Sequence, residues 1–229
     1  MSFHEVVPSI RVARPLPPAI ARTFRALAGT TPVAAASSSA ATAAVLWVAA
    51  RRAGVAVQLV NVDPQRSLAM WLPEAGVIHL PGVEKADDLK RIDRVDVLTI
   101  VDTPPGTAAQ ALAASDVLIG CTGATTMELE GLADLAERLG GPGEIDLVAV
   151  GKFDGRANHG HGVVSQMQPS QRWGASKVVV FPARAEVPYA YDQRREIAMS
   201  SPVAMAGDDL LARVLELEIS APLVKGVAV

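Results

Sequence analysis

The sequence predicts an α/β fold, a doubly wound and mostly parallel sheet flanked by helices. Short β-branched runs alternate along the chain with longer helical patterns. The strand-like runs are apolar on both faces, as in strands that helices cover from each side. The chain has 229 residues, half of them hydrophobic and a fifth charged, which suits one α/β domain. This composition excludes disordered, collagen-like and coiled-coil chains.

The predicted elements follow in order. Apolar, β-branched runs predict strands over residues 32–36, 55–62, 95–101, 116–121, 145–150 and 177–181. Longer patterns between and after them predict helices over residues 40–53, 107–114, 127–139, 162–173 and 208–218. Gly54 is a natural residue to follow the first of these helices, and Gly140-Gly141-Pro142 ends the third. Residues 1–30 are expected to form an N-terminal extension with a short helix over 19–27, and residues 31–229 a single domain.

Charge and cysteine content exclude several classes of protein. The net charge of −3 argues against a nucleic-acid binder that acts through bulk charge. Cys121 is the one cysteine, so neither a disulfide framework nor a cysteine-based zinc site is available, and a small buried core residue is its simplest role. Lysine is scarce: five of the 21 basic residues are lysine, and none precedes Lys85.

No membrane contact is expected. The apolar stretch 33–50 is rich in alanine and contains Ser37-Ser38-Ser39, which favours a buried strand–turn–helix over a membrane span. The N-terminus has no basic region before an apolar run, and residues 210–229 lack a basic amphipathic pattern. We therefore expect a cytoplasmic protein.

Two predicted strands end in a carboxylate. Asp63 follows the strand 55–62, and Asp102 follows the strand 95–101. Ligands of such sheets bind beyond the carboxyl ends of the strands, where a rigidly held carboxylate can position magnesium-bound water beside a phosphate. Each aspartate could instead cap the turn that follows it or bond a neighbouring loop.

The residues around these strand ends resemble a known family. Asp63-Pro64-Gln65 with Ser67 and Trp71-Leu72, and Asp102-Thr103-Pro104-Pro105, resemble the Asp-Pro-Gln segment and the Walker B strand of the ParA/MinD family of partition and positioning ATPases. The resemblance is to the short ParA type and extends from about residue 32 to 218, through segments 127–132, 153–158 and 184–198. It implies a P-loop NTPase-like fold of the deviant Walker A class and a dimer that sandwiches ATP. Under it, Asp63 and Asp102 would hold magnesium through water.

The chain departs from this family at the phosphate loop. The resemblance places the family's signature lysine at Ala34, its phosphate-binding lysine at Ser39 and its magnesium-binding hydroxyl at Ala40, or at Thr42 if the loop is shorter. No alignment supplies a lysine, and the loop contains no glycine to allow φ > 0 and close backbone approach to a phosphate. The acid that many relatives carry two residues before Asp63 is Asn61 here.

These departures predict a vestigial site. Ser37, Ser38, Ser39 and Thr42 form the remnant of the phosphate loop, where a helix N-terminus retains weak anion binding. The missing lysine would have supplied the charge at the β- and γ-phosphates. We expect no catalytic residue, no cofactor and no resident metal, with Asp63 and Asp102 vestigial.

The preferred interpretation is a ParA-like pseudo-ATPase. It would act as a non-catalytic scaffold or adaptor in plasmid or chromosome partition or in intracellular positioning. Its partner would be an adaptor protein or an active ParA-type relative, with a homodimer through apolar contacts as a further option. The alternative is a slow partition ATPase that binds ATP and magnesium, dimerises with nucleotide and uses Arg66 or Arg156 in place of lysine. A third interpretation, a ligase of the dethiobiotin-synthetase type, also needs the missing lysine.

Two other groups of residues have a functional and a plain interpretation. Late basic residues of ParA relatives contribute to sequence-independent DNA binding, and here these are Arg172, Arg184, Arg194 and Arg195. A solvated basic face is their plain interpretation. His159 and His161 have weak metal-ligand spacing and are interpreted as part of a loop.

Overall fold

A seven-stranded sheet forms the centre of the molecule. The structure, a computed structural model, describes residues 24–29, 38–80, 91–92, 94, 97–103, 117–141, 145–154, 162, 178–198 and 200–220. Within them the strand order is β3-β2-β4-β1-β5-β6-β7, and every pairing is parallel. The predicted doubly wound parallel α/β fold is therefore confirmed.

Most predicted elements have observed counterparts. The strands are β1 (Phe24–Gly29), β2 (Val57–Asn61), β3 (Ile78–His79), β4 (Leu98–Thr103), β5 (Val117–Thr122), β6 (Leu147–Phe153) and β7 (Val178–Pro182). The helices are α1 (Ser38–Arg52), α2 (Ser67–Trp71), the 3-10 helix η1 (Pro73–Ala75), α5 (Thr126–Arg138), α7 (Glu186–Asp192) and α8 (Pro202–Ser220). The patterns did not predict β3, α2, η1 or α7, which are short. The helices predicted over 107–114 and 162–173 lie outside the described residues, apart from residue 162.

The N-terminal region differs from the prediction. Residues Phe24–Gly29 form β1, the central strand, which pairs with β4 on one side and β5 on the other. The helix expected over 19–27 is therefore wrong from residue 24, and the domain begins before residue 31. Alanine, leucine and arginine favour a helix locally, but pairing with two strands outweighs that preference. The strand expected over 32–36 lies outside the described residues.

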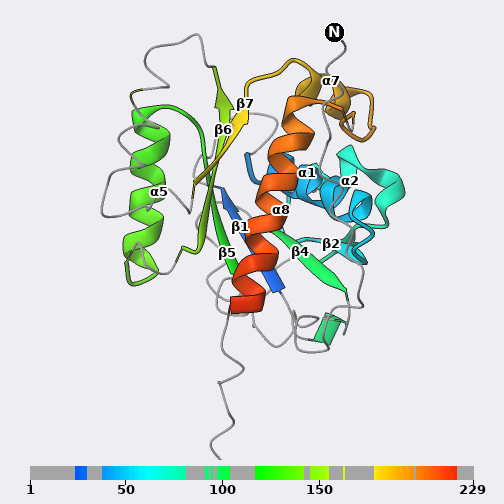
Figure 1. Ribbon diagram of the computed structural model, residues 1–229, viewed down its shortest axis with the longest axis horizontal. Helices are drawn as coiled ribbons and strands as arrows, with labels where there is room; N and C mark the ends of the chain where they lie inside the picture. Colours follow the sequence, from blue (N-terminus) through cyan, green and yellow to red (C-terminus); the bar gives the residue numbers. More distant parts are fainter. Residues whose placement is uncertain are drawn as a thin grey trace, which may run out of the picture.

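Helices cover both faces of the sheet (Figure 1). Side chains alternate between these faces along each strand. On β5, Ile119 and Cys121 join the core beneath α1 and α8, whereas Leu118 joins the core beneath α5. Both faces of the central strands are thus apolar, as the sequence pattern indicated.

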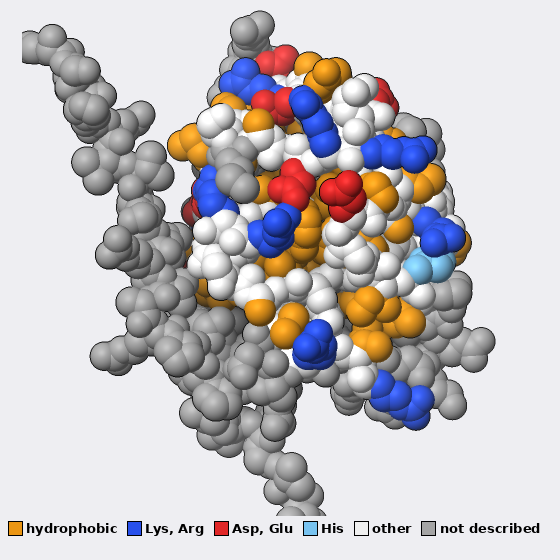
Figure 2. Space-filling view, turned by 90° about the vertical axis from the view of Figure 1, so that its right-hand side faces the viewer, with side chains coloured by type: hydrophobic (Ala, Val, Ile, Leu, Met, Phe, Trp, Pro, Cys, Tyr) orange, Lys and Arg blue, Asp and Glu red, His pale blue; other side chains and the backbone are white. Residues whose placement is uncertain are grey.

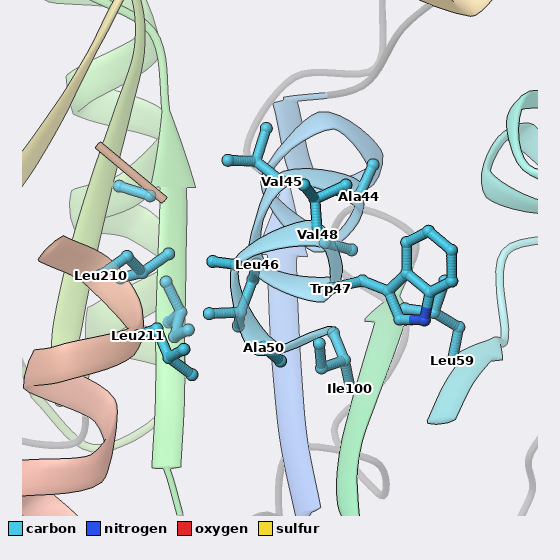
Figure 3. Close-up of a cluster of buried hydrophobic side chains, with 14 of the residues drawn as sticks. Ala44, Val45, Leu46, Trp47, Val48, Ala50, Leu59, Ile100, Leu210 and Leu211 are labelled. Carbon is cyan, nitrogen blue, oxygen red and sulfur yellow. The ribbon is translucent and has the colours of Figure 1, made fainter. Parts of the chain in front are cut away.

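Helix α1 lies within the larger core. Every residue from 43 to 50 is buried, so the helix is apolar around its whole circumference. Val45 and Leu46 lie toward α8, with Leu210 and Leu211, and Ile100 lies on the sheet side (Figure 3). Burial inside the protein accounts for the apolar stretch, and no helix in the described part of the chain has the length and apolarity needed to span a membrane.

Candidate functional site

Three polar side chains form a row at the carboxyl ends of neighbouring strands. In the strand register His79 of β3 pairs with Asn61 of β2, and Asn61 pairs with Asp102 of β4. Residues paired in register project to the same face of a sheet. Asn61 and Asp102 follow Leu59 and Ile100 by two positions, so they share the face covered by α1.

Asn61 is the anomaly in this row. Its side chain is 0% exposed, and among the described residues neither its amide nitrogen nor its amide oxygen has a hydrogen-bond partner. The Nδ1 atom of His79 is also buried without a partner there. A carboxylate in place of Asn61 would put a second negative charge beside Asp102, which is likewise 0% exposed. The neutral amide avoids that repulsion where no cation is held between the strands.

Thr42, Cys121 and Asp102 meet under the first turns of α1. Burial raises the pKa of the Cys121 thiol to about 12, a hydrogen bond from Thr42 lowers it, and the charge of Asp102 raises it. The thiol is therefore a neutral core group and no nucleophile. The Thr42 hydroxyl, a candidate for the metal position, bonds to this sulfur.

Asp63 stabilises the turn that follows β2. Its Oδ1 accepts the backbone N–H of Gln65 at 2.9 Å, and its carbonyl accepts the N–H of Arg66 at 3.0 Å. Arg66 then adopts a left-handed conformation, with φ 57°, before α2 begins. This is the capping role that the sequence left open for Asp63.

The remnant of the phosphate loop contains no charge. Ser38 and Ser39 lie in the first turn of α1, and Ser37 lies outside the described residues. The sequence has no charged residue between Arg25 and Arg51, so the N-terminus of α1 has no side-chain cation from its own loop. Among the described residues no group of three acidic, histidine or cysteine side chains could hold a metal ion. A magnesium triphosphate placed there would meet no lysine or arginine side chain from this loop.

A cavity of about 630 Å³ opens toward the opposite edge of the sheet from this row, between α1, α7, α8 and the ends of β6 and β7. Apolar groups dominate its walls, and Lys152, Arg184 and Asp192 supply its charges. Lys152 has φ 55°, and the β6–β7 register shifts between Val150 and Phe153. A bulge of this kind often re-aims side chains near a site. No sequence pattern indicated this cavity, and the weak signal for Lys152 was its place just beyond the predicted strand 145–150.

The predicted DNA-binding arginines fall into separate places. Arg184 precedes α7 and lines the cavity, whereas Arg194 and Arg195 follow α7 and are exposed. The Arg195 guanidinium lies 4.8 Å from the centroid of the Tyr189 ring. The backbone carbonyl of Arg195 accepts a hydrogen bond from the indole N–H of Trp71 at 2.9 Å. Arg172, like Arg156, His159 and His161, lies outside the described residues.

A second groove lies between α1, η1 and β2. Figure 2 shows a face of the molecule on which acidic and basic side chains surround a group of hydrophobic side chains. The groove includes Trp47, Arg51, Glu74 and Glu196 in its walls. The Arg51 guanidinium lies 4.6 Å from the Trp47 ring centroid and pairs with Glu196. Arg51 of the chain itself thus occupies the position that a cationic ligand would take beside Trp47 and Glu196.

Comparisons with known proteins identify the fold. No family model matches the chain, and no curated protein does. The chain is similar to a MinC:MinD cell division protein complex from Aquifex aeolicus, with TM-score 0.65, 13% identity, and 84% of this chain and 95% of that chain covered. It is also similar to a plasmid partition protein from Borrelia burgdorferi bound to AMPPNP, with TM-score 0.65, 12% identity and coverage of 85% and 98%. A third structure is an ATP complex of McdA from Cyanothece, with TM-score 0.57, 13% identity and coverage of 91% and 99%. The chain has the ParA/MinD fold.

Proposed function

We propose that this chain, built on the ParA/MinD fold, is a pseudo-ATPase that acts as a partition or positioning scaffold with little or no ATP binding. The observation that carries the proposal is the uncharged segment between Arg25 and Arg51, which joins the central strand to α1. A triphosphate placed there would meet no lysine, and its charge would be balanced only by backbone N–H groups.

The neighbouring polar residues support the same conclusion. Thr42 bonds to Cys121, Asp63 caps its own turn, and Asn61 is neutral beside Asp102. Thr42 and Asp63 thus have structural roles that need no metal or nucleotide. Without a nucleotide to switch it, the protein would present the same binding surface at all times.

The proposed partner is a protein. One structural neighbour is a complex of two proteins, MinC and MinD, and others are a plasmid partition protein and McdA. We propose that this chain binds an adaptor or an active relative with the same fold, or a second copy of itself.

Calorimetric titration with ATP and magnesium tests the proposal. We expect no saturable heat of binding at nucleotide concentrations below millimolar. We also expect phosphate to be released no faster than in buffer without the protein. Asp102→Ala should behave like the wild type in both assays. Micromolar binding or measurable turnover in the wild type, abolished by Asp102→Ala, would overturn the proposal.

The alternative function, a slow ATPase, predicts a different hydrodynamic result. Such an enzyme would dimerise when ATP and magnesium are added, whereas a scaffold keeps one oligomeric state with or without them. Light scattering during size-exclusion chromatography measures this directly, and a nucleotide-dependent doubling of mass would favour the ATPase.

Weak DNA binding is a further proposed property. It is supported by the exposure of Arg194 and Arg195 beside Tyr189. Reversing both charges (Arg194→Glu with Arg195→Glu) should weaken binding to all sequences alike and flatten its salt dependence. Arg94→Glu with Arg138→Glu, which reverses two exposed arginines outside this segment, is the control for net charge. Equal binding by the two double variants in fluorescence anisotropy would exclude the Arg194–Arg195 surface.

A further inference from the structure

The cavity beside α1 has the size of a ligand site and mostly apolar walls. Its volume of about 630 Å³ lies within the range of small-molecule pockets. Val45, Phe181, Val187 and Val203 contribute apolar surface from four different elements. Thr42 is one of its few polar wall groups, and its hydroxyl bonds to Cys121. The mostly apolar walls therefore suit an apolar body.

The charges at the cavity are unequal. Lys152 at the end of β6 and Arg184 before α7 are positive, and Asp192 at the end of α7 is negative. All three side chains are exposed, so they can meet a ligand's polar end in water. The surplus of one positive charge favours a ligand with a single negative charge.

Lys152 is held in a costly conformation at this place. Its φ of 55° is left-handed, a region that glycine adopts freely and other residues rarely adopt. The strain accompanies the shift of the β6–β7 register, and the bulge places the lysine beside the cavity.

We propose that this cavity binds an amphipathic monoanion, an apolar chain or ring system that carries one carboxylate. The apolar body lies between α1, α7 and α8, and the carboxylate lies at Lys152 and Arg184. The inference rests on the proposed function in one respect: Thr42 of the predicted loop remnant lines the cavity, and the cavity is free only if no magnesium nucleotide binds there.

Calorimetry with straight-chain carboxylates below their micelle concentrations tests the site. Affinity should rise about three- to fourfold per added methylene from octanoate to dodecanoate, since each methylene leaves water. Decanoate should bind at least about tenfold more tightly than decyltrimethylammonium, its cationic counterpart, because a charge-assisted bond is replaced by repulsion.

Two glycine variants separate binding from folding. Lys152→Gly removes the cation and the left-handed strain together, so decanoate affinity should fall about tenfold while the melting temperature does not fall. Arg66→Gly is the matched control, because Arg66 is also a left-handed cation and does not line the cavity. It should keep the wild-type affinity.

Several results would overturn the inference. Dodecanoate that does not bind saturably, affinity independent of chain length, or equal affinity in Lys152→Gly and Arg66→Gly would each do so. Failure of carboxylate binding alone leaves the proposed scaffold function standing. Displacement of bound decanoate by micromolar magnesium ATP would overturn the proposed scaffold function, because the nucleotide would then occupy this cavity.

Discussion

At the scale of a residue, the pKa of the Cys121 thiol depends on how tightly the protein is packed around it. Burial is the main reason that its pKa rises from 9.0 to about 12. In the unfolded chain the thiol ionises near 9.0, whereas in the folded protein it stays neutral until about 12. Its contribution to stability is therefore full below pH 9.0 and is lost as the pH rises toward 12.

This pKa predicts slow alkylation. At pH 8 the thiolate fraction of native Cys121 should be about a thousandfold below that of the unfolded chain. Iodoacetamide should consequently label the protein at a rate set by unfolding, which mass spectrometry measures with and without denaturant. Labelling of the native protein as fast as a free thiol would contradict this burial. Cys121→Ala should lessen the loss of stability above pH 9.

Asn61 gives a second prediction at the scale of a residue. Asn61→Asp places a carboxylate in a fully buried position beside Asp102 and should cost roughly 2–4 kcal/mol of unfolding free energy at pH 7. The loss should shrink near pH 4, where the new carboxyl takes up a proton. Urea denaturation at the two pH values measures both effects.

Asn61→Leu is the matched control. It removes two amide atoms that have no partner among the described residues and introduces no charge, so its cost should be small or negative. An equal loss in both variants, unchanged at pH 4, would show that the buried charge is not the cause.

At the scale of elements, α8 lies against α1 through a glycine. A Cβ on Gly207 would lie 2.4 Å from Val45 Cγ1 and 3.2 Å from its carbonyl oxygen. Gly207→Ala should therefore destabilise the fold by about 1–3 kcal/mol, although alanine is the better helix former by about 1 kcal/mol.

A double-mutant cycle separates these effects. Val45→Ala removes the clashing methyl group, so Gly207→Ala should cost less in that background than in the wild type. Thermal or urea unfolding of the four proteins gives the coupling energy. Additive losses would mean that the close approach of α1 and α8 does not determine the cost.

The elements that were predicted correctly share a physical origin. The runs at β2, β4, β5, β6 and β7 are largely apolar on both faces and α1 is apolar all round, so hydrophobicity identified them, whereas a helical pattern identified α5 and α8. Helices α2 and α7, of 5 and 7 residues, are too short for periodicity to reveal. The two helices are in contact through Trp71 of α2 and Tyr191 of α7, whose ring centroids lie 5.7 Å apart in an edge-on arrangement.

At the scale of the whole molecule, β1 determines where the domain begins. A shortened chain starting at residue 31 lacks the strand between β4 and β5 and should not fold. Ala26→Pro in the full chain should cost about 3 kcal/mol or more, because Ala26 pairs with Val101 on one side and Leu118 on the other. Circular dichroism and denaturant unfolding measure both, and a cooperative wild-type transition in either protein would contradict the central place of β1.

The sequence by itself determined the parallel α/β class, most of the buried strands and the absence of lysine before Lys85. Hydrophobic pattern and residue identity act locally, and these features depend on them. Only the tertiary structure placed Phe24–Gly29 at the centre of the sheet, aligned His79, Asn61 and Asp102, and brought Lys152 and Arg184 to one cavity. Strand order and the meeting of distant loops arise from pairing and packing between segments far apart in the chain, which no local pattern contains.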